Sequence, residues 1–336
     1  MSNPFPSANA GAGTLTLSAI DRHLPDAQIA QWNFNVQHEL TKAMVLEVGY
    51  QGSKGTYLPL LYNLNQPPPG VGTVAQKQAL RRYPQYGNIT YLTASGNSNF
   101  NALLVRLEHR YNYGLSFLLS YMYGKSIDDT PGTPYNVTPS RSSAADPTNF
   151  RRERGLSGFD LRHRMVFSPV YELPFGRGKA FLNENRVVGA IAGGWQLAGI
   201  LTLQSGRPFT ALVSRDNANV LASVDRPNII GNGNDGPKTV QQWINVSAFQ
   251  LAPAGTYGNA GRNNLIGPSW KNVDLVVSRT FRVTERIAAQ FRVEAFNAFN
   301  HPNFDLPVQT FDTPSFGSIP SAEAARQLQF GLKIKF

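Results

Sequence analysis

The chain of 336 residues contains no cysteine, which excludes disulfide bonds, thiol catalysis and zinc sites built on cysteine. Charged residues are also scarce, at 15% against roughly 25% in ordinary soluble domains. No apolar run approaches the roughly 18 residues of a membrane helix. Residues 1–6 lack the basic and apolar regions of a secretory signal peptide. We therefore expect neither a disulfide scaffold nor a helical membrane protein.

Hydrophobic residues make up 41% of the chain and aromatic residues 11%, so the chain is not disordered. The formal net charge of +10 would permit contact with nucleic acid or an anionic membrane. The basic residues are scattered, however, and the densest cluster, residues 151–154, includes the acidic Glu153. We expect no nucleic-acid partner.

Apolar and polar residues alternate without a break at the end of the chain. Leu328, Phe330, Leu332, Ile334 and Phe336 fall on one face of an extended segment, and the residues between them fall on the other. A helix would scatter these positions around its circumference, so the alternation predicts a β-strand. About ten such residues can cross a bilayer as a tilted strand.

Eight further segments show the same alternation: residues 31–37, 44–51, 103–110, 115–126, 161–172, 195–204, 272–278 and 289–295. Two are imperfect, because Pro169 interrupts one and Val276 occupies a polar face of another. The polar faces carry side chains suited to a wet lumen: Arg106, Glu108, Arg162, Arg164, Glu172, Gln290, Arg292, Glu294 and Lys333. We expect Glu172 and Glu294 to pair across the sheet with Arg162, Arg164 or Arg292.

The connections between these segments alternate in length. Short turns fall near Thr41, at residues 111–114 and at residues 282–285, while long segments span residues 52–99, 128–157, 206–269 and 300–325. A connection of intermediate length spans residues 174–194. Loops this long are unusual in a compact soluble domain. Short turns on one side and long loops on the other are typical of an outer-membrane barrel.

A soluble β-sandwich could also supply nine alternating strands. The barrel is favoured because aromatic residues gather near the strand ends, as in the girdles of membrane barrels: Trp32, Tyr50, Tyr121, Tyr123, Tyr171, Trp195, Phe281, Phe299 and Phe336. The sequence therefore predicts an all-β, antiparallel transmembrane β-barrel.

Motifs for cofactor or metal chemistry lack the context they need. Residues 231–236 spell GxGxxG, but Pro237 follows and no helical pattern continues, so we expect a flexible surface loop. The five histidines show neither HxH nor HxxxH spacing. No pairing of nucleophile and base is evident, so a hydrolase with its site in the loops has little support. We expect no catalytic residue, cofactor or metal.

Several runs of the sequence together resemble a known family, the TonB-dependent outer-membrane receptors of the Oar-like type found in Acidobacteria. They span nearly the whole chain in order: residues 31–37 (QWNFNVQ), 47–55 (EVGYQGSKG), 120–128 (SYMYGKSID), 160–164 (DLRHR), 171–178 (YELPFGRG), 194–197 (GWQL), 204–209 (QSGRPF), 294–304 (EAFNAFNHPNF) and 329–336 (QFGLKIKF).

The resemblance implies the C-terminal part of a barrel, with about nine of an expected 22 strands. Residues 29–336 would form this part, and residues 1–28 would be the remnant of an extracellular loop with a weak extra strand at 14–19. The plug domain, the TonB box and the signal peptide of the family have no counterpart here. We therefore expect a truncated gene product, one piece of a split gene or a misplaced start codon.

The function that this resemblance implies is energised uptake of an unidentified extracellular ligand at the outer membrane of a Gram-negative bacterium. The implied partners are outer-membrane lipid and lipopolysaccharide, the barrel-assembly machinery and, through the missing plug, the TonB complex. The pattern from Leu328 to Phe336 resembles the signal that the assembly machinery reads. A passive barrel or adhesin-like surface protein and a soluble β-sandwich binding module are the alternatives.

Overall fold

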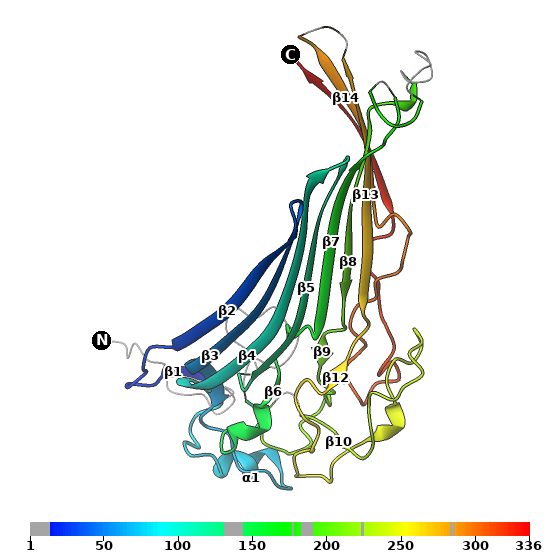
Figure 1. The fold of residues 1–336 in the computed structure, drawn as a ribbon. Helices are drawn as coiled ribbons and strands as arrows, with labels where there is room; N and C mark the ends of the chain where they lie inside the picture. Colours follow the sequence, from blue (N-terminus) through cyan, green and yellow to red (C-terminus); the bar gives the residue numbers. More distant parts are fainter. Residues whose placement is uncertain are drawn as a thin grey trace, which may run out of the picture.

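One large antiparallel sheet dominates the protein (Figure 1). The computed structural model describes residues 14–130, 144–176, 178–182, 191–222, 225–282, 284 and 286–336. Nine strands follow one another across the sheet: β2 (Gln28–Thr41), β3 (Met44–Asn63), β4 (Ile89–Asn112), β5 (Leu115–Asp128), β7 (His163–Glu172), β8 (Trp195–Gln204), β13 (Trp270–Arg282), β14 (Ala288–Phe296) and β15 (Gln327–Lys335). They correspond one to one with the nine segments predicted from the alternation.

The register explains why these strands pair. Apolar positions of successive strands lie opposite one another, as in the row Leu46, Leu107, Leu119, Phe167, Leu201 and Val273. The polar row Gln37, Glu47, Arg106 and Ser120 lies one residue away. A shift of one residue would exchange the two faces, so the alternation fixes the register. The sheet therefore has one apolar face and one polar face.

β3 and β4 are longer than their alternation predicts. They continue pairing beyond Lys54 to Asn63 and Thr90, so the connection expected over residues 52–99 is reduced to residues 64–88. The pairing register shifts between Gly55 and Leu58 and again between Leu58 and Leu60. Such irregularities break the period of two while the pairing continues, which is why the pattern does not predict this part.

Two minor strands attach to this sheet, which therefore counts 11 strands. β1 (Leu17–Ile20) pairs in parallel with the start of β4, and β6 (Gly155–Leu156) pairs with the end of β5. β1 overlaps the weak strand expected at 14–19, and it lies on the start of β4 and not beside β2. Residues 1–13 lie outside the described residues.

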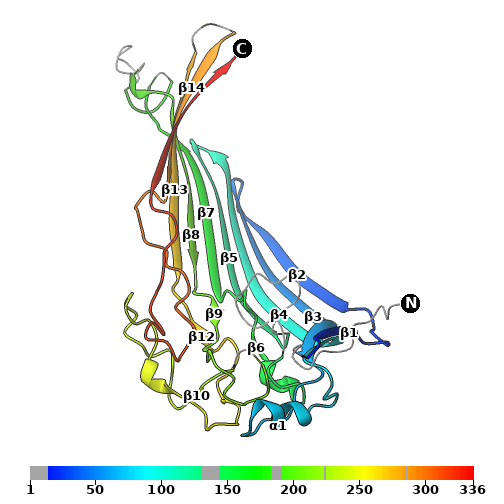
Figure 2. The same cartoon turned by 180° about the vertical axis from the view of Figure 1, so that it is seen from behind.

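Long and short connections gather at opposite ends of the sheet (Figure 2). The end with α1 (Val74–Ala79), β9 (Pro208–Phe209), β10 (Asn228–Ile229), β11 (Phe249–Gln250) and β12 (Leu265–Ile266) is here named the loop end. The other end holds the turns from β2 to β3 and from β4 to β5, together with the C-terminus, and is named the turn end. No helix in the described part of the chain has the length and apolar character needed to span a membrane.

The long connections form a packed body with a hydrophobic core of its own. This loop assembly comprises the described residues of 64–88, 144–162, 205–269 and 297–326. Its buried cluster consists of Phe209, Ala211, Ile244, Ala248, Phe249, Leu265 and Phe316. The predicted GxGxxG loop packs against this cluster, because a Cβ atom at Gly233 would meet the side chains of Leu265 and Phe249. Gly231, Asn232 and Asp235 are exposed, so residues 231–236 form a surface loop as expected, and Gly233 anchors this loop on the core.

Buried ion pairs fasten the loop assembly to itself and to the sheet. Arg226 donates to Glu153 over 2.6 Å, with both side chains only 3% exposed. Arg262 binds the carboxylate and the carbonyl of Asp128, and it also donates to the carbonyl of Glu153. Because Asp128 ends β5, this arginine joins the loops to the rim of the sheet.

Candidate functional site

A cavity of about 630 Å³ lies at the loop end of β8 and β13. Gln204 ends β8 and pairs in register with Trp270, the first residue of β13. The cavity is lined by Gly158, Phe159, Leu161, Gln204, Arg207, Pro268, Trp270, Phe304, Asp305, Leu306 and Glu323. Its volume falls in the range of about 300–1,000 Å³ that is usual for small-molecule sites.

The first wall is a tight crossing of two backbones beyond these strands. β9 pairs with β12, and the amide of Gly267 donates to the carbonyl of Arg207 over 2.9 Å. A Cβ atom at Gly206 would lie 1.8 Å from the carbonyl oxygen of Gly267, so only glycine fits at this crossing. The backbone of Arg207 is thereby held beside the cavity.

The second wall is formed by the segment that follows β14. Asn303 accepts from the amide of Lys271 over 2.8 Å, and its carbonyl accepts from the amide of Glu323 over the same distance. The Ser321 hydroxyl donates to the carboxylate of Asp305 over 2.5 Å. These bonds set residues 304–306 and Glu323 against the start of β13.

The chemistry of the lining is mixed. Phe159, Trp270 and Phe304 supply aromatic rings, while Arg207 and Glu323 supply opposite charges. Within the described part of the chain, neither the guanidinium of Arg207 nor the carboxylate of Glu323 has an ion pair or a hydrogen bond. An apolar cavity with a few unpaired polar groups is the usual form of a ligand site.

The predicted lumen residues fall into small groups along the sheet. Arg106 binds Glu108 on its own strand over 2.9 Å and Glu47 on the neighbouring strand over 3.8 Å. Arg164 lies opposite Gln204, which lines the cavity. These residues do not converge on one site.

Glu172 and Glu294 do not pair across the sheet as expected. Glu294 binds Arg292, which lies on the same strand, over 2.5 Å. Gln290 lies opposite Lys333 in the register of β14 and β15. Glu172 accepts from Tyr111 over 2.7 Å and from Lys179 over 3.1 Å. Among the described residues, the partners of the Glu172 carboxylate are therefore a tyrosine and a lysine and not an arginine.

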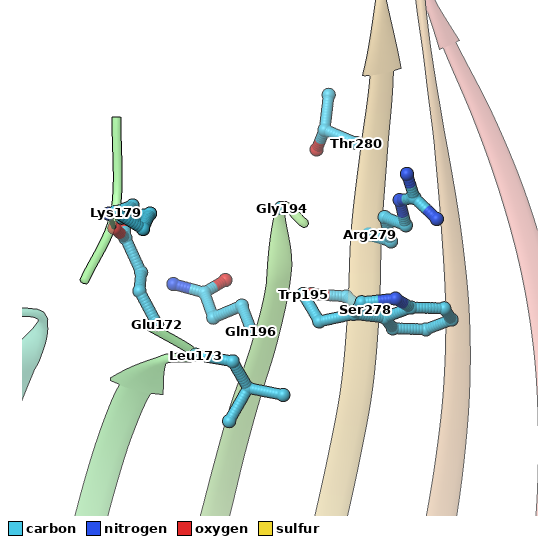
Figure 3. Close-up of a pocket in the computed structure, with 9 residues that line it drawn as sticks. All are labelled: Glu172, Leu173, Lys179, Gly194, Trp195, Gln196, Ser278, Arg279 and Thr280. Atoms are coloured by element: carbon cyan, nitrogen blue, oxygen red, sulfur yellow. Dashed lines mark hydrogen bonds and ion pairs between the residues drawn. The ribbon is translucent and has the colours of Figure 1, made fainter. Parts of the chain in front are cut away.

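A second, smaller cavity of about 260 Å³ surrounds Glu172 at the turn end (Figure 3). Glu172 and Lys179 lie side by side there, and the hydrogen bond to Glu172 raises the pKa of Lys179 above its ordinary value. Arg279 lies over the ring of Trp195, with 5.5 Å to the ring centroid. Because Glu172 and Lys179 already neutralise each other, this cavity offers a ligand less unpaired charge than the loop-end cavity.

Two predicted groups of residues lie apart from both cavities. Arg162 precedes β7, and its guanidinium lies 5.9 Å from the ring centroid of Tyr123. The terminal residues Leu328, Phe330, Leu332 and Ile334 are exposed in β15, and Phe336 follows the strand. β15 pairs with β14 alone among the described strands, so its outer edge is open.

The loop-end cavity is absent from the sequence prediction. Its residues come from five separate segments of the chain between Gly158 and Glu323, and no local pattern joins them. Among the described residues no three His, Cys, Asp or Glu side chains gather as metal ligands.

Solved structures of several outer-membrane proteins resemble the chain. The outer membrane transporter YddB from Escherichia coli has a TM-score of 0.49 and 11% identity, with 96% of this chain and 34% of that chain covered. BauA, the ferric preacinetobactin receptor from Acinetobacter baumannii, has a TM-score of 0.45 and 8% identity, with 91% of this chain and 29% of that chain covered. The FrpB iron transporter from Neisseria meningitidis has a TM-score of 0.43 and 9% identity, with 95% of this chain and 32% of that chain covered. The chain thus spans about a third of the length of these structures.

No protein with a curated description matches the chain. A family match covers almost all of it: residues 1–329 match the outer membrane beta barrel domain. The nine meandering strands, with long loops at one end and short turns at the other, agree with this match. The chain belongs to the outer membrane beta barrel family.

Proposed function

We propose that the chain is part of the barrel of a TonB-dependent outer-membrane receptor that takes up an extracellular ligand. The apolar face of the sheet then meets lipid, the polar face lines the lumen, and the loop end lies outside the cell. The family and the sequence runs that resemble Oar-like receptors support this proposal. Residues 1–28 would then close a preceding extracellular loop.

The loop-end cavity carries the proposal. It lies at the rim where Gln204 and Trp270 of the sheet meet the loop assembly, which is where a ligand arriving from outside would first be held. Buried ion pairs and a hydrophobic core fix the loops around it. A fixed, preformed pocket reduces the ordering cost of binding, so the arrangement suits capture.

The proposed partners follow from this placement. Outer-membrane lipid and lipopolysaccharide would contact the apolar face, and the barrel-assembly machinery would pair with the open edge of β15. The TonB complex would act through a plug domain.

Energised uptake can be tested on intact cells that produce the complete protein. The probe is a defined mixture of tripeptides, cello-oligosaccharides, ferric hydroxamates and cobalamin, and its depletion from the medium is measured by mass spectrometry. We expect one class of compound to be depleted only when the gene is present and only without a protonophore. Depletion that persists with the protonophore would indicate a passive barrel, and no gene-dependent depletion would favour a surface protein such as an adhesin.

A further inference from the structure

The loop-end cavity brings together unpaired groups of three chemical kinds. Arg207 presents a cation, Glu323 presents an anion, and Gln204 presents a side-chain amide, none with a hydrogen-bonding partner in the described part of the chain. Aromatic rings of Trp270 and Phe304 line the same space. Arg207 and Glu323 are exposed to solvent and Gln204 is half-buried, so all three groups are free to bind a ligand that offers them counterparts.

The charges narrow the class of ligand. Asp305 and Glu323 outnumber Arg207, so the lining carries more negative than positive charge and disfavours a polyanion. A neutral sugar could stack on the rings but would compensate neither Arg207 nor Glu323. A ligand with both an ammonium group and a carboxylate compensates the two residues together.

The side-chain amide of Gln204 and the aromatic rings restrict the class of ligand further. The side chain of Gln204 offers one carbonyl acceptor and an NH₂ donor, which match the donor and the acceptor of a peptide unit. The rings of Trp270 and Phe304 suit apolar side chains. We propose that this cavity binds short apolar peptides with free amino and carboxy termini, the carboxylate at Arg207 and the ammonium group at Glu323. This inference rests on the proposed receptor function and names its substrate class.

The test is equilibrium binding to outer-membrane vesicles from cells that produce the complete protein, with vesicles lacking the gene as the blank. The probes are radiolabelled Leu-Phe-Leu, its N-acetylated form, its C-amidated form and cellotriose. We expect the free peptide to bind and each blocked form to bind at least about fivefold more weakly, which corresponds to one exposed ion pair. Cellotriose binding in place of the peptide would overturn the proposal.

Two variants assign the ends of the peptide. In Arg207→Gln, the amidated peptide should bind as tightly as the free peptide, while the acetylated peptide should still bind more weakly. In Glu323→Gln, the acetylated peptide should bind as tightly as the free peptide, while the amidated peptide should still bind more weakly. Arg215→Gln is the matched control, because Arg215 is an exposed arginine of the same loop assembly that pairs with Asp312 and does not line the cavity. Assembly of each variant is confirmed by heat-modifiable gel mobility. If acetylation and amidation weaken binding equally in all variants, the assignment of the peptide termini to Arg207 and Glu323 is wrong.

The outcome is independent of energised uptake, because isolated vesicles receive no energy from TonB. If each variant loses discrimination against only one blocked peptide, the peptide site is supported. If depletion of the peptide from the medium then persists with the protonophore, the proposed TonB-dependent uptake is wrong. Energised depletion of another class of compound, without peptide binding, would overturn the peptide site and leave the receptor.

Discussion

The buried pair of Arg226 and Glu153 shows how single residues hold the loops. Both side chains are 3% exposed, and Arg226 also donates to the carbonyl of Arg152 over 3.0 Å. Replacing Arg226 with Met leaves the carboxylate of Glu153 buried without its cation. We expect a loss of about 3–5 kcal/mol in the stability of the loop assembly, measured by hydrogen exchange of its backbone amides.

The matched control is Arg106→Met on the polar face of the sheet. The side chain of Arg106 is 51% exposed, and its partner Glu47 is 31% exposed. Solvent screens such a pair, so the expected cost is only about 0–1 kcal/mol. If the two substitutions changed the hydrogen-exchange protection of the loop amides equally, the buried pair of Arg226 and Glu153 would not be what stabilises the loops.

Neighbouring residues of β15 should respond oppositely to charge. Leu332 lies opposite Phe291 in the register of β14, and Lys333 lies opposite Gln290. If the apolar face meets lipid, Leu332→Arg near the bilayer midplane costs about 2–4 kcal/mol. Lys333→Arg keeps the charge in a wet lumen and should cost far less. Urea titration of the complete protein in lipid vesicles measures both, and equal costs would refute the proposed faces.

At the scale of elements, the period of two was sufficient to predict all nine principal strands. Every strand from β2 to β15 in the meander contains its predicted segment to within two residues at the ends, because a half-apolar sheet demands alternation. The pattern failed where pairing persisted through irregularities, as between Gly55 and Leu60 in β3. It also missed the loop core, since this cluster gathers residues far apart in sequence, such as Phe209, Leu265 and Phe316.

The cavity could not be predicted for a related reason. Gln204 was recognisable as the end of a predicted strand, but Asp305 and Glu323 are held at the rim by hydrogen bonds of Asn303 and Ser321. Side-chain contacts of this kind leave no periodic trace in the sequence. What the alternation predicts is the scaffold, while the site depends on how the connections fold back.

The open edge of β15 gives a prediction about assembly. Its apolar residues at every second position, followed by Phe336, offer a template to which the assembly machinery can add a strand. Deleting Phe336 from the complete protein should leave unassembled, protease-sensitive chains, measured by the loss of heat-modifiable mobility. If Phe336 only completes an aromatic girdle, assembly would continue with a modest loss of stability.

At the scale of the whole molecule, the two ends of the sheet differ in kind. The loop end is a packed body with its own core, and the turn end carries the short turns, the connection from β7 to β8 and the C-terminus. Protease sensitivity alone is therefore a poor guide to which end faces outward, because packed loops resist cleavage as tight turns do. A chemical label that needs only an exposed side chain is a better probe.

The absence of cysteine makes this test direct, because any thiol introduced into the chain is unique within it. Val71 in the loop assembly is 78% exposed, and Tyr113 in the turn after β4 is 95% exposed. A membrane-impermeant maleimide added to intact cells should label Val71→Cys within the complete protein. It should label Tyr113→Cys only after the outer membrane is permeabilised, since that turn then faces the periplasm. Labelling of Tyr113→Cys on intact cells, with Val71→Cys protected until permeabilisation, would invert the topology and place the loop-end cavity on the wrong side for capture from outside.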